Sequence, residues 1–227
     1  MSSELAAGVL LIVLPIAFNV CFTLLARDFD YPDILRRPTA EVLDLFRAGG
    51  ARLLLLWWVF ALTAVLLAPL AVLLVSVLDA DPVVLSIGAT IGVLAALVQF
   101  LGLMRWPFLV PYLARADADA SPARHEAIDV VFQSFHRYLG VAVGEHLGYL
   151  FTGTWTVLVG VALTQADVAA PWLGIVGIII GSLLALCSLE FVGPFEPGGW
   201  KLAGTLTPIA YIAWSLWLVA VGIALLL

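Results

Sequence analysis

The chain has 227 residues, of which 63% are hydrophobic and only 11% are charged, and its formal net charge is −6 at pH 7. This composition excludes a water-soluble globular domain and identifies the lipid bilayer as the main partner. The chain also lacks the basic surface that nucleic-acid binding requires, so we expect no nucleic-acid partner.

Six apolar segments are each long enough to cross a bilayer, which takes about 20 helical residues. Pro69 predicts a kink in the second segment, because proline lacks the N–H group that a helix needs. The sequence therefore predicts an all-α, polytopic integral membrane protein with one domain of six transmembrane helices. The expected spans are about residues 5–25, 53–77, 83–104, 143–163, 172–189 and 205–227.

Two further segments, about residues 39–48 and 122–140, predict short amphipathic helices. In the first, Thr39 is the expected start and Gly49 the expected stop. The second begins at Ser121-Pro122, an N-cap followed by proline at the first helical position. We expect both helices to lie at the inner membrane face or to dock on the bundle. The second should turn one apolar face inward, formed by Ile128, Val131, Phe132, Phe135 and Leu139, and a polar face outward, formed by His125, Asp129, Gln133 and His136.

The basic residues occupy every second gap between the spans. All ten lie in or beside the first, third and fifth gaps, whereas the second and fourth hold only the acids Asp79, Asp81 and Asp167. Because Lys and Arg stay in short cytoplasmic loops, this alternation predicts a protein of the cytoplasmic (inner) membrane with its N- and C-termini outside.

Small residues recur four positions apart in three spans, and such rows let helix backbones approach closely inside lipid. These contacts could lie within a monomer, in a homo-oligomer, or with another membrane protein. At Gly144 we expect a neighbouring backbone to cross. The rows are Gly88, Gly92 and Ala96, then Gly140, Gly144 and Gly148, then Gly177, Gly181 and Ala185.

The densest polar cluster is Glu145, His146 and Tyr149, which share one helix edge at the start of the fourth span. An acid in the hydrocarbon costs about 3 kcal/mol on insertion scales, so such residues are candidates for a ligand or proton site. The alternative is a structural anchor in which Glu145 pairs with Arg105 or Arg137.

Three other residues bear on this candidate site. Tyr138 is a third possible anchoring partner of Glu145, but it lies about 10.5 Å back along the helix and needs a bend or a water to reach the carboxylate. Gln99 and Glu190 could join the cluster in lining a cavity open to the inner side. Alternatively, Gln99 makes one interhelical hydrogen bond and Glu190 is simply exposed at the interface.

We expect no metal and no cofactor. His125 and Asp129 weakly resemble a zincin helix, but His136 is about 16 Å further along, too far to share one ion. All three histidines lie between residues 125 and 146, so haem cannot bind between histidines of facing helices. The chain also lacks a nucleophile elbow, a Walker loop and a dinucleotide fingerprint, so a catalytic residue is not expected.

Several segments together resemble one bacterial family, the multi-pass membrane proteins of the DUF4386 type. The resemblance covers nearly the whole chain and implies the fold and membrane residence, without an activity. The segments are Phe29-x-Tyr31-Pro32-x-x-Leu35-x-x-Pro38, Leu103-x-Arg105-Trp106-x-Phe108-x-Val110-Pro111, His136-x-Tyr138-x-Gly140-x-x-x-Gly144-Glu145-x-Leu147-Gly148, Trp172-Leu173-Gly174-x-x-Gly177 and Tyr211-x-x-Trp214-x-Leu216-Trp217.

Three functions fit this sequence. A non-catalytic accessory, assembly or regulatory component is favoured, because recognisable catalytic motifs are lacking. A small-solute or proton-coupled carrier would use the polar cluster with Gln99 and Glu190. A membrane-embedded enzyme acting on a lipid or quinone is the third. A polar cavity would favour the carrier, a lateral groove beside His146 the enzyme, and a solid core the accessory role.

Overall fold

The computed structural model describes residues 2–227, and within them the chain is all-helical. Six helical segments are long and apolar enough to cross a membrane, so the protein is an all-α integral membrane protein, as the sequence predicts. The elements are α1 (Ser3–Phe29), η1 (Asp33–Arg36), α2 (Thr39–Val65), α3 (Leu67–Val77), α4 (Pro82–Asp117), α5 (Pro122–Phe135), η2 (His136–Leu147), α6 (Gly148–Gln165), α7 (Pro171–Cys187), η3 (Ser188–Phe191), η4 (Gly193–Phe195) and α8 (Lys201–Leu226).

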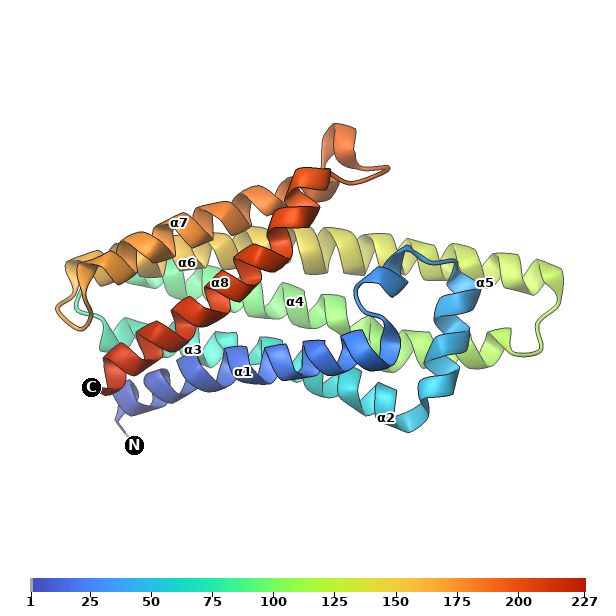
Figure 1. Ribbon diagram of the computed structural model, residues 1–227, viewed down its shortest axis with the longest axis horizontal. Helices are drawn as coiled ribbons and strands as arrows, with labels where there is room; N and C mark the ends of the chain where they lie inside the picture. The colour runs from blue at the N-terminus through green and yellow to red at the C-terminus, as the bar shows by residue number, and fades with distance from the viewer. Residues whose placement is uncertain (1) are drawn as a thin grey trace.

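The helices run along the long axis of the molecule, with both termini at one end and α5 at the other (Figure 1). We term these the terminal end and the arginine-rich end. At the arginine-rich end α1 gives way to α2, and α4 turns into α5.

The second membrane segment is divided between two helices. Its first helix, α2, ends at Val65, and α3 begins at Leu67. The break lies just before Pro69, which cannot donate the hydrogen bond that would join the two pieces. The kink expected at this proline is therefore present.

A bend at Gly50 divides α2 into a docked part and a spanning part. Gly50 has φ 55° and ψ −149°, a conformation open essentially to glycine alone. The first part buries Val42, Leu43 and Phe46. The short amphipathic helix expected from residue 39 is thus present, and it stops one residue later than Gly49.

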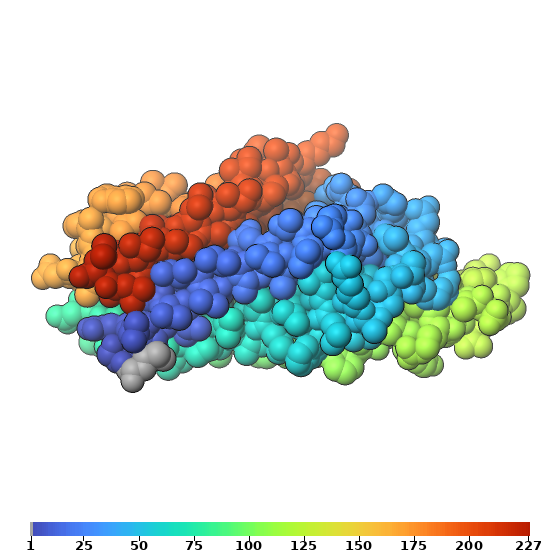
Figure 2. Space-filling view, turned by 60° about the horizontal axis from the view of Figure 1, so that its bottom comes forward, coloured from blue at the N-terminus to red at the C-terminus, as the bar shows by residue number. Residues whose placement is uncertain are grey.

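The first part of α2 packs on the hairpin of α4 and α5, which protrudes past the rest of the chain (Figure 2). Arg47 Nη1 donates a 2.6 Å hydrogen bond to the carbonyl oxygen of Ala114 in α4. On the α5 side, Thr39 donates to Asp129 and accepts from Gln133 Nε2 at 3.0 Å. This helix is therefore docked on the bundle.

The faces of α5 agree only in part with those expected. Ile128 and Phe132 of the expected apolar face are buried, whereas Val131 and Phe135 are exposed. The polar residues remain at least partly exposed but bond to neighbouring helices, Asp129 and Gln133 to α2, and His125 Nδ1 at 2.6 Å to Asp117 Oδ1 of α4. Helical spacing alone could not reveal this, because α5 has polar partners on two neighbouring helices.

Two separate hydrophobic cores divide the length of the molecule. The apolar core, toward the terminal end, joins α1, α3, α4, α6, α7 and α8 around residues such as Leu70, Trp155 and Leu218. The aromatic core, at the arginine-rich end, joins α1, η1, α2, α4 and α5. In it, Trp57 and Trp106 stack with their ring centroids 4.4 Å apart.

Helices far apart in sequence close the bundle. The first and last helices, α1 and α8, lie side by side (Figure 1). Asn19 Nδ2 of α1 donates a 2.9 Å hydrogen bond to Ser215 Oγ of α8. Nearer the termini, Gly222 of α8 lies against the backbone of Gly8.

Glycines lie at the closest contacts between helices. The contacts in the following sentences join helices of this one chain. A Cβ atom built on Gly144 would lie 3.2 Å from Gly102 Cα, which confirms that a neighbouring backbone crosses at Gly144. On either side of this crossing, Gly140 faces Arg105 and Gly148 faces Gln99, both of α4. The middle glycine row therefore lies against α4.

We predict that Gly102→Ala destabilises the protein by about 1–3 kcal/mol, because its Cβ would overpack the contact with η2. The added atom would lie 2.6 Å from Gly144 Cα and 2.9 Å from the Leu139 carbonyl oxygen. Gly88→Ala on the same helix is the matched control, since its nearest neighbour would be 3.7 Å away. Melting temperatures in detergent should fall for Gly102→Ala only, and equal values would contradict the prediction.

Candidate functional site

The candidate site is built on η2, a π-helix of 12 residues that leads into α6. Wide helical turns of this kind are rare and often mark functional sites. Gly140 and Gly144 leave room on η2 for the Arg105 side chain and for the α4 backbone. The same element carries Glu145 and His146.

Glu145 is a carboxylate without an ion pair among residues 2–227. The positive charges of Arg105 and Arg36 and the negative charge of Glu190 are nevertheless close enough to act on it. Glu145 thus faces a mixed set of charges from α4, η1 and η3 without being bound to any of them.

Arg105 is buried in the bundle, with 8% of its surface exposed. Its Nη1 donates a hydrogen bond to the carbonyl oxygen of Gly102, and its guanidinium lies 5.2 Å from the centroid of the Trp106 ring. Arg105 therefore does not form the expected ion pair with Glu145, and its hydrogen bond is to its own helix.

The other two expected anchors point elsewhere. Arg137 pairs with Glu196 at 2.8 Å, and both side chains are largely exposed. Tyr138 is 68% exposed on the outside of η2. The structure therefore does not bring Arg137 or Tyr138 to Glu145.

The two remaining acid–base residues connect helices. His146 Nδ1 lies 2.7 Å from the carbonyl oxygen of Ser188 and so links η2 to η3. The Glu190 carboxylate packs against Gly204 of α8, where a Cβ atom would be 2.8 Å from its Oε1.

Further polar groups lie inside the bundle on α4, α6 and α8. Gln99 Nε2 donates a 2.9 Å hydrogen bond to Thr152 Oγ1, which is one of the two alternatives expected for Gln99. The Tyr211 ring lies 5.4 Å from the ring of Tyr149. Deeper in the bundle, Trp214 Nε1 donates a 2.9 Å hydrogen bond to Thr156 Oγ1.

These residues form a polar layer between the apolar core and the aromatic core. Tyr31 and Arg36 complete it from the loop between α1 and α2. The sequence did not single out Tyr31, Thr152 or Tyr211 as site residues, although Tyr31 and Tyr211 stand in the family-like segments. The layer consists of Tyr31, Arg36, Gln99, Arg105, Glu145, Tyr149, Thr152, Glu190 and Tyr211.

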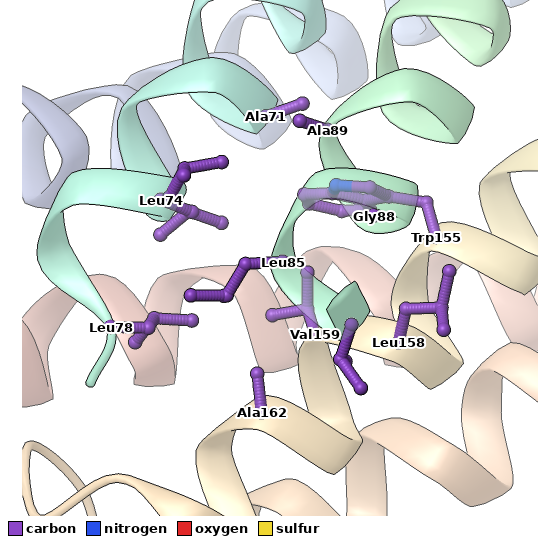
Figure 3. Close-up of a pocket in the computed structure, with 12 residues that line it drawn as sticks. Ala71, Leu74, Leu78, Leu85, Gly88, Ala89, Trp155, Leu158, Val159 and Ala162 are labelled. Carbon is purple, nitrogen blue, oxygen red and sulfur yellow. The ribbon is translucent and has the colours of Figure 1, made fainter. Parts of the chain in front are cut away.

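Two hollows lie toward the terminal end, and neither is lined by residues of the polar layer. One is a surface groove of about 200 Å³ on α4, lined by Ser86, Ile87, Thr90 and Ile91. The other, shown in Figure 3, is an apolar cavity of about 10 Å³ between α3, α4 and α6. It has room for about one water molecule but offers few polar groups to hold one.

The layer presents chemistry suited to proton binding. Residues 2–227 contain no group of three or more His, Cys, Asp or Glu side chains that could hold a metal ion. A carboxylate near two guanidinium groups and several hydroxyls can bind or release a proton and change the local charge.

Comparison with known proteins identifies one family. The family model described as Domain of unknown function (DUF4386) matches residues 6–222. No curated protein and no solved structure gives a significant match to the chain.

Tyr31 offers a direct test of how the loop between α1 and α2 packs on the bundle. Burial raises the pKa of its hydroxyl, and the negative charge of Glu145 raises this pKa further, whereas Arg105 lowers it. In an unfolded chain Tyr ionises near pH 10. Neutral Tyr31 therefore contributes stability that is present below about pH 10 and is lost as the pH rises toward the folded pKa.

We predict that Tyr31→Phe loses less stability than the wild type between about pH 9 and about pH 11. The measurement is the melting temperature in detergent across this range. Tyr112→Phe removes the hydroxyl of a ring that is 62% exposed and should follow the wild type. Parallel curves for all three proteins would contradict the buried placement of Tyr31.

Proposed function

The chain belongs to the DUF4386 family, and we propose that it is a non-catalytic, regulatory component of a bacterial cytoplasmic membrane. Its responsive element is the polar layer, where Glu145 gains or loses a proton. The observation that carries the proposal is the position of Glu145 between two cores, near Arg105 but without an ion pair to any of residues 2–227.

A change in the charge of Glu145 would affect the aromatic core. Arg105 interacts electrostatically with Glu145, and its guanidinium lies over Trp106. Trp106 in turn stacks on Trp57 of α2. Protonation of Glu145 would remove a negative charge near a buried cation and so weaken the arrangement around Trp106.

The polar groups reach only part of the way through the bundle, and this favours regulation over transport. From Glu145 they extend to Thr156. Beyond this level the buried neighbours are apolar, for example Leu74, Val159 and Leu163. A polar layer that can be reached only from the arginine-rich end suits a sensor of the conditions on that side of the membrane.

A proton-coupled carrier is the second candidate function. It is supported by the polar groups of Tyr149, Tyr211 and Thr152 inside the bundle, which could pass protons toward the middle of the membrane. The enzyme has less support, because His146 is engaged by the Ser188 carbonyl oxygen.

The decisive variant is Glu145→Gln, which keeps the shape of the side chain but fixes it neutral. The wild type in detergent or nanodiscs should change its tryptophan fluorescence reversibly with pH, because Trp57 and Trp106 stack beside the layer. The variant should stay in the low-pH form throughout. Hydrogen exchange of residues 51–60 and 103–114 in the variant should be roughly tenfold faster than in the wild type at neutral pH.

Glu196→Gln is the matched control, since this carboxylate is exposed and pairs with Arg137 at the surface. It should leave the fluorescence response and the hydrogen exchange of the aromatic core unchanged. A wild-type signal that does not depend on pH, or a Glu145→Gln variant that still responds, would count against the proposal.

We further propose that the arginine-rich end faces the cytoplasm, because Lys and Arg gather there. Single cysteines replacing Ala80 and Ala118, in a chain without Cys21 and Cys187, test this sidedness. An impermeant thiol reagent added to intact cells should label position 80 and not position 118. Labelling of position 118 alone would reverse the topology.

A further inference from the structure

The segment between α7 and α8, residues 191–200, leaves the bundle sideways. It follows a spanning segment, Pro171–Phe191, of 21 residues. At 1.5 Å per residue this length is about 31 Å, close to the thickness of the hydrocarbon core, so the chain leaves the hydrocarbon near Phe191. In Figures 1 and 2 the segment projects from one side of the molecule.

The direction of this projection decides what surrounds the segment. The spanning helices follow the long axis of the molecule, so this axis lies close to the membrane normal. The hairpin of α4 and α5 extends along the axis and therefore into water. A segment that leaves sideways where a spanning helix ends lies instead over the headgroups of neighbouring lipids. The ion pair of Glu196 with Arg137 places it on the side of the arginine-rich end.

The segment is ordered by its own contacts. The Gly199 N–H donates a 2.8 Å hydrogen bond to the Phe195 carbonyl oxygen, and the Trp200 N–H donates a 2.7 Å hydrogen bond to the Glu190 carbonyl oxygen. The rings of Phe195 and Trp200 stack with their centroids 5.4 Å apart. The segment thus has a defined shape although its side chains belong to neither hydrophobic core.

This shape leaves apolar groups at the surface. No residue from 191 to 200 is buried, and Val192 and Phe195 are both exposed. The next residue, Lys201, is also exposed and has no ion pair within residues 2–227. Aromatic rings beside a basic residue are typical of the headgroup region, because the rings are apolar while their polar edges and the ammonium group meet water and phosphate.

We propose that residues 191–200 form an interfacial segment that binds the lipid leaflet at the arginine-rich end. Val192, Phe195 and Trp200 insert among the headgroups, and Lys201 faces lipid phosphate. The partner is the leaflet because the segment lies at the level where the chain leaves the hydrocarbon and projects away from the bundle. The inference goes beyond the proposed function and does not depend on Glu145.

The experiment places a bimane fluorophore on a single cysteine, Val192→Cys, in the full chain in nanodiscs. The background carries Cys21→Ala and Cys187→Ala, and the stacked rings of Phe195 and Trp200 stay in place. Lipids with a nitroxide in the headgroup should quench this label about threefold or more strongly than a label at Ala118→Cys. Iodide in the buffer should quench the two labels in the opposite order.

Ala118→Cys is the matched control, since it is exposed in the turn between α4 and α5 at the same end of the molecule. Leu97→Cys, on the exposed surface of α4, is the depth reference and should be quenched most by a nitroxide deep in the acyl chain. If the label at position 192 responds to iodide as the label at position 118 does, the segment lies in water and the proposal is overturned. Strongest quenching of position 192 by the deep nitroxide would overturn it as well.

A second pair of variants tests the role of the rings. Phe195→Ser should lower the headgroup quenching at position 192 about twofold, because an apolar ring no longer holds the segment at the interface. Phe195→Trp should retain the quenching, since tryptophan suits the same environment. Equal quenching in the two variants would show that the ring does not bind the segment to the leaflet and would overturn the proposal.

Discussion

The burial of Arg105 is the constraint on which the arginine-rich half of the molecule depends. A guanidinium inside a helix bundle is costly unless its donors find acceptors. Here the Gly102 carbonyl oxygen accepts one hydrogen bond from the Arg105 guanidinium, and the Trp106 ring covers one face of it. Gly140 leaves space on the other side, where a Cβ atom would lie 2.8 Å from Nη2. Because η2 packs closely along α4 here, Glu145 of η2 lies at the level of Arg105. The buried Arg105 therefore neighbours both the aromatic core and the acid.

The sequence predicts the helices well, because apolar length and helical period are properties of single segments. It also places the amphipathic helix that begins at Thr39, since a glycine stop acts locally. The capping role expected of Thr39 is wrong, because Pro38 is the N-cap residue and the Thr39 hydroxyl bonds Asp129 instead. Glu145 and Gln99 could be found as candidates because polar side chains are rare in spanning helices. In contrast, Thr152 gives no such signal, since threonine in a helix commonly bonds its own backbone. The position of Tyr31 depends on how a loop folds back, which no periodic pattern encodes.

The charged residues show a second limit of sequence reasoning. Arg137 pairs with Glu196 at the surface, and exposed ion pairs contribute little free energy, so this pairing could not be chosen in advance. The hydrogen bonds of Asp129 and Gln133 to α2 were missed for another reason. Their partner, Thr39, lies on a different helix far away in sequence. Polar contacts between helices become predictable only when the packing is known.

The pairing of α1 with α8 has a consequence for biosynthesis. Helix α1 is synthesised before α8 and packs against it, through Asn19 with Ser215 and through Gly8 with Gly222. Until α8 is inserted, the amide of Asn19 therefore lacks its partner on the neighbouring helix and faces lipid or a chaperoning protein. The nascent chain cannot close its bundle progressively, helix by helix. Insertion of α8 is itself the step that joins α1 to this neighbour, and until then the Asn19 amide has only its own-helix acceptor, the Pro15 carbonyl oxygen.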